Sequence, residues 1–120
     1  MEKDVKLFEV SHGGAVFRVK IVDKMLVSCG ETSIRIWKRT DGQLLQKLEL
    51  PGSCNNFDLN SESTLLAAAH DKGVWIYKFH NRTKIMEIEL KAVIDVRFNQ
   101  PGTRLIVGQH SGQISKIDLY

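Results

Sequence analysis

An internal repeat constrains the fold of this chain more than any other feature of its sequence. The segments Ile34–Trp37, Val74–Tyr77 and Ile114–Ile117 align when the chain is shifted by about 40 residues each time. The alignment continues outside these segments, because Leu65–Ala67 falls on Leu105–Val107. A period of this length, with a short apolar strand in each copy, is typical of arrays in which every repeat forms one small antiparallel sheet. The sequence therefore predicts three copies that together fill the chain.

The pattern between the repeated segments predicts an all-β fold. No sustained helical period is present, and short apolar runs alternate with turn signals such as Asp41-Gly42. The connections are too short to carry helices, so neighbouring strands are expected to be antiparallel. Leu65–Ala69 is apolar at every position, which is typical of a strand covered on both faces. The expected strands are Val5–Val10, Val16–Val22, Met25–Cys29, Ile34–Lys38, Gln43–Leu50, Cys54–Leu59, Leu65–Ala69, Val74–Phe79, Lys84–Leu90, Val93–Phe98, Leu105–Val107 and Ile114–Leu119.

The composition indicates an ordinary globular chain, with 42% hydrophobic and 26% charged residues. No apolar run approaches the roughly 18 residues that a membrane helix needs. The start of the chain, Met1–Asp4, lacks the plan of a signal peptide, so we expect an intracellular protein, cytoplasmic or nuclear. Cys29 and Cys54 each fall inside an expected strand and are predicted to be buried, reduced thiols.

Over residues 5 to 120 the chain resembles the WD40 repeat family. In the WD40 pattern a Gly-His pair precedes the first strand of a repeat, and tryptophan with aspartate ends the third strand. His12 and Trp37 stand at the histidine and tryptophan places of the first repeat, which is one residue short before Glu31. The resemblance implies a buried hydrogen-bond chain from Trp37 through Ser28 to His12 and the acidic turn residue. The repeat signature comprises His12, Ser28, Glu31, Trp37, Asp71 and Tyr77, the last standing in for tryptophan in the second repeat.

The resemblance implies antiparallel β-propeller blades of WD40 type, about three of them, in one domain over residues 1–120. The repeats span approximately residues 5–50, 51–90 and 91–120. Because known propellers have about 4 to 8 blades, we expect a partial propeller. Two interpretations follow: the chain is a fragment of a larger propeller, or a homodimer closes a six-bladed ring. In both, the outer strand Val5–Val10 and the inner strand Ile114–Leu119 present edges that seek a partner strand.

The resemblance implies a non-catalytic scaffold that binds other proteins or peptides. In WD40 domains the rim and the start of the first strand of each blade commonly touch partners. The segment Ile34–Trp37, followed by Asp41–Leu45, is also similar to repeats of F-box/WD substrate receptors, so a partner-recognition role in a complex such as a ubiquitin ligase is one hypothesis. For Phe17 the alternative is a place in the core. The expected contact residues are Phe17, Asn55, His70, Ile94 and His110, with both histidines in exposed turns.

Other functional classes find less support in the sequence. The net charge of +3 is spread along the chain, which disfavours nucleic acid, although a propeller that binds nucleic acid or ribonucleoprotein stays the alternative function. No nucleophile, phosphate-loop or metalloprotease motif is present, so we expect no catalytic residue. His70 and His110 share one phase of the repeat, but neither has a second ligand at suitable spacing, so we expect no metal site and no cofactor.

Overall fold

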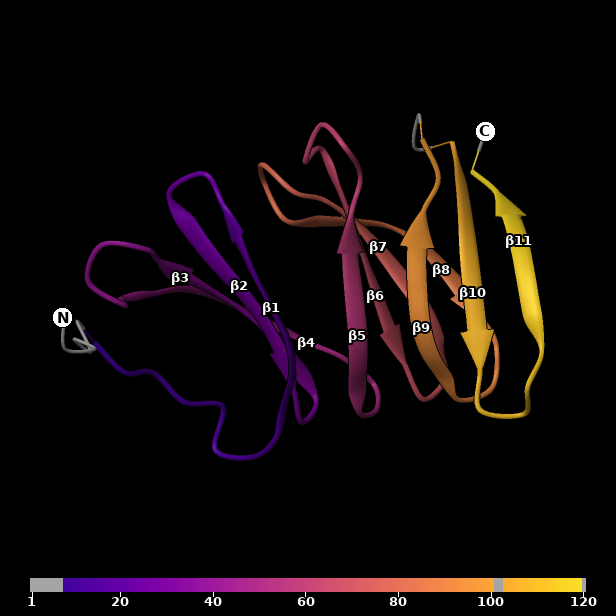
Figure 1. Cartoon of the computed structure of the whole chain (residues 1–120), viewed down its shortest axis with the longest axis horizontal. Coiled ribbons are helices and arrows are strands. Elements are labelled where there is room, and N and C mark those ends of the chain that lie inside the picture. Colours follow the sequence, from indigo (N-terminus) through magenta and orange to yellow (C-terminus); the bar gives the residue numbers. More distant parts are fainter. Residues whose placement is uncertain (1–7, 101–102, 120) are drawn as a thin grey trace, which may run out of the picture.

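The computed structural model describes residues 8–100 and 103–119, and within them every regular element is a β-strand. The strands form three antiparallel sheets, two of four strands and one of three (Figure 1). In each sheet the strands pair in the order in which the chain makes them. The all-β prediction is therefore confirmed. The strands are β1 Val16–Val22, β2 Met25–Gly30, β3 Ser33–Lys38, β4 Leu44–Glu49, β5 Cys54–Leu59, β6 Leu65–His70, β7 Gly73–Lys78, β8 Thr83–Glu89, β9 Val93–Phe98, β10 Arg104–Gln109 and β11 Ile114–Asp118.

The expected strands agree closely with the observed ones, with one exception. Val16–Val22, Cys54–Leu59 and Val93–Phe98 match to the residue, and eight others shift by no more than two residues at either end. The exception is Val5–Val10, whose first three residues lie outside the described residues. Its last three residues are described and belong to no strand, so the prediction is wrong for that half. Among the described residues the third sheet accordingly has three strands, with β11 at its edge.

Tight turns explain why consecutive strands pair with each other. Asp23 and Ser63 adopt positive φ angles of 55° and 56° in the turns that follow β1 and β5. In the second of these turns Oδ1 of Asn60 accepts the backbone N–H groups of Thr64 and Leu65, at 2.8 and 2.9 Å. Short polar side chains that satisfy nearby backbone groups are the usual means of closing such turns.

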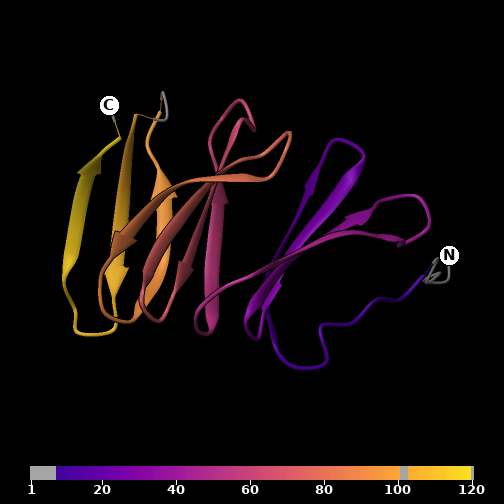
Figure 2. The same ribbon diagram turned by 180° about the vertical axis from the view of Figure 1, so that it is seen from behind.

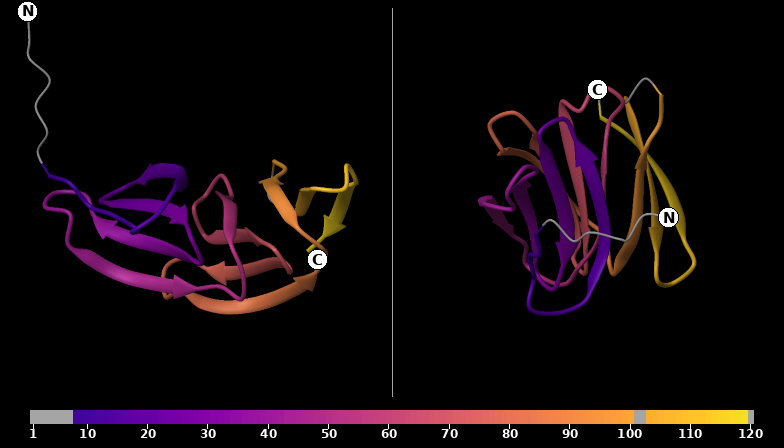
Figure 3. Two further views of the ribbon diagram at one scale, coloured as in Figure 1. Left: turned by 90° about the horizontal axis from the view of Figure 1, so that it is seen from below. Right: turned by 60° about the vertical axis from the view of Figure 1, so that its left-hand side comes forward.

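The three sheets stand side by side, with the second sheet between the other two (Figures 1 and 2). Seen from below, the sheets lie in chain order from one end of the molecule to the other (Figure 3). The strands β1 and β2 pack against β5, and β5 and β6 pack against β9. Backbone hydrogen bonds also join the sheets: the N–H of Cys54 donates to Glu31, and the N–H of Ala92 donates to Asp71, both at 2.6 Å. None of the sheets formed by the described residues is closed, so closure into a ring remains a prediction.

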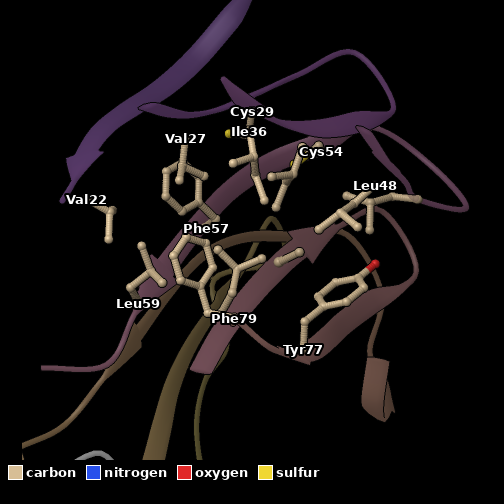
Figure 4. Close-up of a cluster of buried hydrophobic side chains, with 14 residues drawn as sticks. Val22, Val27, Cys29, Ile36, Leu48, Cys54, Phe57, Leu59, Tyr77 and Phe79 are labelled. Atoms are coloured by element: carbon tan, nitrogen blue, oxygen red, sulfur yellow. The ribbon is translucent and has the colours of Figure 1, made fainter. Parts of the chain in front are cut away.

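A buried apolar cluster fills the space between the first and second sheets (Figure 4). Phe57 is fully buried at its centre, between side chains of β2 and β3 on one side and of β6 and β7 on the other. Cys29 and Cys54 belong to the same cluster and are free, buried thiols, as predicted. A second cluster joins the second and third sheets. Its fully buried members are Ala67, Ala69, Val74, Ile76, Val93, Val96, Leu105 and Val107.

Strand β6 contributes to both clusters. Leu66 and Ala68 face the first sheet, whereas Ala67 and Ala69 face the third. Because successive side chains of a strand point to opposite faces, only a continuously apolar strand can cover both interfaces. The expectation that Leu65–Ala69 is buried on both faces is confirmed.

Candidate functional site

A β-bulge recurs near the start of the first strand in all three sheets. The register shifts between Val16 and Arg18 in β1, between Cys54 and Asn56 in β5, and opposite Gly108 and Gln109 in β9. The residues at these irregular positions are Phe17, Asn55 and Ile94. A bulge gives one strand an extra residue and re-aims its side chain away from the regular ladder. Three of the positions expected to contact partners therefore occupy equivalent bulges in the three sheets.

Two of these three side chains are open to solvent. Phe17 is 57% exposed and Ile94 is 49% exposed, so the alternative place of Phe17 in the core is wrong. Asn55 is half-buried and already engaged. Its Nδ2 donates to Oδ1 of Asp71 at 3.1 Å and to the carbonyl of Val93 at 2.8 Å, which ties the second sheet to the third. Asn55 therefore holds this edge together and offers little free polar surface.

The two histidines expected in exposed turns differ in the structure. His110 follows β10 and is exposed, as expected. His70 is instead the last residue of β6 and only 1% exposed, so its expected place in an exposed turn is wrong. The physical reason is the alternation of β6, which points His70 to the same side as Leu66 and Ala68, toward the first sheet.

The first repeat contains most of the hydrogen-bond chain that the resemblance implies. Nε1–H of Trp37 donates to Oγ of Ser28 at 2.9 Å, and Nε2 of His12 lies 2.6 Å from the same oxygen. All three side chains are buried, and the rings of His12 and Trp37 meet edge to face. Buried polar groups that satisfy each other in this way rigidify the segment that carries them. The chain from Trp37 to His12 thus fixes the N-terminal segment on the first sheet.

The continuation of this chain to Glu31 is absent. Nδ1 of His12 has no hydrogen-bond partner among the described residues. Glu31 lies in a turn with a positive φ of 49°, and its carboxylate lies beside Gly13 and Gly14. In the second repeat, the signature residues make different contacts: Asp71 accepts from the N–H of Ser53 and from Asn55, and Tyr77 is buried in the cluster that faces the first sheet. The expected continuation of the hydrogen-bond chain from His12 to Glu31 is therefore wrong.

Acidification is expected to destabilise the fold through His12 and His70. Burial is the main cause that lowers the pKa of both side chains from 6.5, so the folded state favours their neutral forms. Their stabilising contribution is complete above the unfolded-state pKa and is lost as the pH falls from there toward the folded-state pKa. Urea titrations between about pH 7.5 and 5.5 measure this slope.

The matched variants for this measurement are His12→Gln, His70→Gln and His110→Gln. The first two remove a buried titrating ring and are expected to flatten the pH dependence of the unfolding free energy. His110 is exposed, so its variant serves as the control and leaves the slope unchanged. If the wild-type chain became more stable on acidification, the assignment of the pH dependence to neutral, buried His12 and His70 would be wrong.

Sequence reasoning missed a groove beside Trp75. The groove lies between Pro51, in the linker after the first sheet, and the turn and strands of the second sheet that carry His70, Trp75 and Glu87–Lys91. The available signal was Trp75 itself, a large aromatic residue at the place where the first repeat has Arg35.

Comparisons with models of known protein families and with curated proteins find no match to this chain. Within residues 8–100 and 103–119, no group of three or more His, Cys, Asp and Glu side chains is placed to hold a metal ion. The described part of the chain also contains no helix that is long and apolar enough to cross a membrane.

Proposed function

We propose that this chain is a non-catalytic module of WD40 type that binds other proteins, and that its three sheets are consecutive propeller blades. The threefold repeat of one antiparallel meander and the contacts of Trp37, Ser28 and His12 support this proposal. The exposed apolar residues Val19 and Ile21 on the first sheet suit an arc that continues into further blades or a second copy. An intracellular location and a place in a complex such as a ubiquitin ligase rest on the sequence alone.

One observation carries the protein-binding role. The repeated bulge presents Phe17 and Ile94 to solvent at equivalent places in the first and third sheets. Exposed apolar residues held by rigid strands are the usual anchors of protein interfaces, because their burial supplies binding energy with little loss of conformational freedom. Asn55 occupies the equivalent position in the second sheet. Its two hydrogen bonds hold the second sheet against the third.

The test is the loss of a partner when these anchors are removed. A photo-crosslinking phenylalanine analogue at position 17 identifies proteins that touch this edge, and purified candidates are then titrated against three chains. We expect the double variant Phe17→Ala, Ile94→Ala to bind at least about tenfold more weakly than the wild type. Ile85→Ala is the matched control, since Ile85 is also exposed but lies on the outer strand β8, and it should bind normally.

A titration with single-stranded RNA and duplex DNA at low and high salt distinguishes the alternative function, nucleic-acid binding, from protein binding. Nucleic-acid affinity that falls steeply with salt, together with partner binding that is unaffected by the double variant, would overturn the proposal in favour of a nucleic-acid-binding module. Salt-insensitive partner binding that depends on Phe17 and Ile94 supports it.

A further inference from the structure

Two faces of the molecule point away from the second sheet, one at each end of the row of sheets (Figures 1 and 3). On β1, Val22 packs toward the second sheet, so alternation places Val19 and Ile21 on the opposite face, which we call the first end face. On β11, Ile117 packs toward the second sheet, so Ile114 lies on the opposite face, the third end face. Within the part of the chain that the structure describes, no further sheet covers either end face.

Val19, on the first end face, occupies a position that is buried in the other two sheets. It pairs with the fourth residue of β2, as Phe57 pairs with the fourth residue of β6 and Val96 with the fourth residue of β10. Phe57 and Val96 have no exposed surface, whereas Val19 is 65% exposed. The first sheet thus exposes an apolar position that the second and third sheets bury.

Ile114, on the third end face, differs from its equivalents in the same way. It pairs with the fifth residue of β10, as Ile34 pairs with the fifth residue of β2 and Val74 with that of β6. Ile34 and Val74 have no exposed surface, but Ile114 is 79% exposed. The half-buried Ile106 lies on the same face. Exposed apolar side chains that gather on one face mark an interaction site.

These two positions meet in both interfaces inside the molecule. Ile34 and Phe57 belong to the cluster between the first and second sheets. Val74 and Val96 belong to the cluster between the second and third sheets. In each interface, a face equivalent to the third end face covers a face equivalent to the first end face. The two end faces are therefore the two halves of an interface that the molecule already forms twice.

We propose that a second copy of this chain covers both end faces, with Ile114 of each copy packed against Val19 of the other. The two contacts form together around a twofold axis, so neither end face stays exposed. Two copies of three sheets bring six together, within the range of about 4 to 8 blades that propellers have. The number of copies rests on the proposed propeller arrangement, whereas the match between the end faces rests on the burial of their equivalents. The homodimer is thereby selected over the fragment of a larger propeller.

The area of the end faces favours a closed dimer over a single contact. The third sheet has three strands of five or six residues, so its face measures about 14 by 20 Å, or roughly 300 Å². One contact between two such faces buries roughly 600 Å² in total, which is below the range of about 1,200–2,000 Å² for stable interfaces. A closed dimer makes two such contacts and reaches the lower end of this range, so we expect a dimer that dissociates on dilution.

The test is a pair of complementary charge variants, Val19→Asp and Ile114→Lys, studied by analytical ultracentrifugation over a range of concentrations. Each variant alone places a charge in both contacts of the closed dimer, so we expect each to be monomeric. A mixture of the two forms one unaltered contact and one in which the two introduced charges attract each other. We expect the mixture to recover the dimer, with a dissociation constant at least about tenfold below that of either variant alone.

Ile85→Lys is the matched control for these charge variants. Ile85 is 45% exposed but lies on β8, in the second sheet, and therefore on neither end face. Its variant is expected to dimerise like the wild type. Both test positions are exposed, so neither variant is expected to unfold the chain, and circular dichroism of each variant checks this.

Lys116→Ile tests the third end face by a gain of affinity. Lys116 pairs with the third residue of β10, the place that Ile36 and Ile76 hold against β2 and β6. Ile36 and Ile76 are buried in the two internal interfaces. Because a charge is costly to bury, its removal is expected to strengthen the dimer about three- to tenfold.

The inference is wrong if the wild-type chain is a monomer at every concentration, if either charge variant dimerises as well as the wild type, or if their mixture stays monomeric. Assemblies that grow beyond the dimer would also overturn it, because they indicate an open chain of contacts. A monomer that loses a partner in the double variant Phe17→Ala, Ile94→Ala overturns only the dimer. A dimer whose partner binding does not depend on Phe17 and Ile94 overturns only the contact surface assigned to the bulges.

Discussion

Phe57→Ala is expected to lower the free energy of unfolding by about 3–5 kcal/mol. Phe57 has no exposed surface and lies at the centre of the cluster between the first and second sheets (Figure 4). Truncation to alanine removes the ring and leaves a cavity whose walls belong to two sheets. It also removes the face on which the guanidinium of Arg18 rests, with Cζ 5.4 Å from the ring centre. Since these contacts help to hold the sheets together, we expect the loss to affect the whole unit.

Chemical denaturation followed by circular dichroism and by tryptophan fluorescence measures this effect. Trp37 reports on the first sheet and Trp75 on the second, so coincident transitions would show that the sheets unfold together. The matched control is Phe17→Ala, which deletes the same ring from an exposed position in β1 and is expected to change stability by less than about 1 kcal/mol. A similar loss in both variants would contradict the assignment of Phe57 to the core.

The sequence predicted the strands well because their signals are local. Turn residues and short apolar runs recur with the repeat, and they placed β1, β5 and β9 to the residue. The continuous apolar run of β6 also predicted that both of its faces are buried, since no polar residue interrupts it. Closure of the arc depends on pairing between distant parts of the chain or between chains. Local patterns carry no information about such pairing.

The candidate site was predicted only in part, for physical reasons that differ between residues. The repeat placed Phe17, Asn55 and Ile94 at equivalent positions, but a bulge arises from sheet pairing and has no clear sequence signature. His70 was assigned to a turn because a turn signal follows it. The alternation of Leu66 and Ala68 was the stronger signal, because it continues to His70 and points the ring into the interface. The groove depends on the linker at Pro51 meeting the second sheet, which is a tertiary contact.

Asp58 is the residue whose replacement tests how the three sheets are joined. It lies in β5 of the second sheet and is only 8% exposed. Its Oδ2 accepts the backbone N–H of Phe98 in β9 at 2.8 Å, and its Oδ1 lies 3.6 Å from Nη2 of Arg18 in β1. One carboxylate therefore contacts both neighbouring sheets. Its two oxygens make different contacts, so two substitutions can separate their effects.

Asp58→Ala is expected to cost about 2–3 kcal/mol, because it leaves a backbone N–H and a partly buried guanidinium without their acceptor. Asp58→Asn keeps an oxygen for the N–H of Phe98 but loses the charge opposite Arg18, so we expect about half of that loss. Asp118→Ala is the control, since Asp118 pairs with Arg104 on the exposed surface of the third sheet and such pairs contribute little.

Thermal and urea unfolding of these three variants show whether the Asp58 carboxylate connects both neighbouring sheets or acts only as an ion pair with Arg18. If Asp58→Asn and Asp58→Ala were equally destabilising, the ion pair with Arg18 would dominate and the bond to Phe98 would contribute nothing. If neither variant differed from Asp118→Ala, the sheets would be held by their apolar clusters alone. We expect Asp58→Ala to be much less stable than Asp58→Asn, and Asp58→Asn to be less stable than Asp118→Ala. That order of stability would mean that a single carboxylate orients both neighbouring sheets. The carboxylate would then connect β1 at Arg18 with the end of β9 at Phe98.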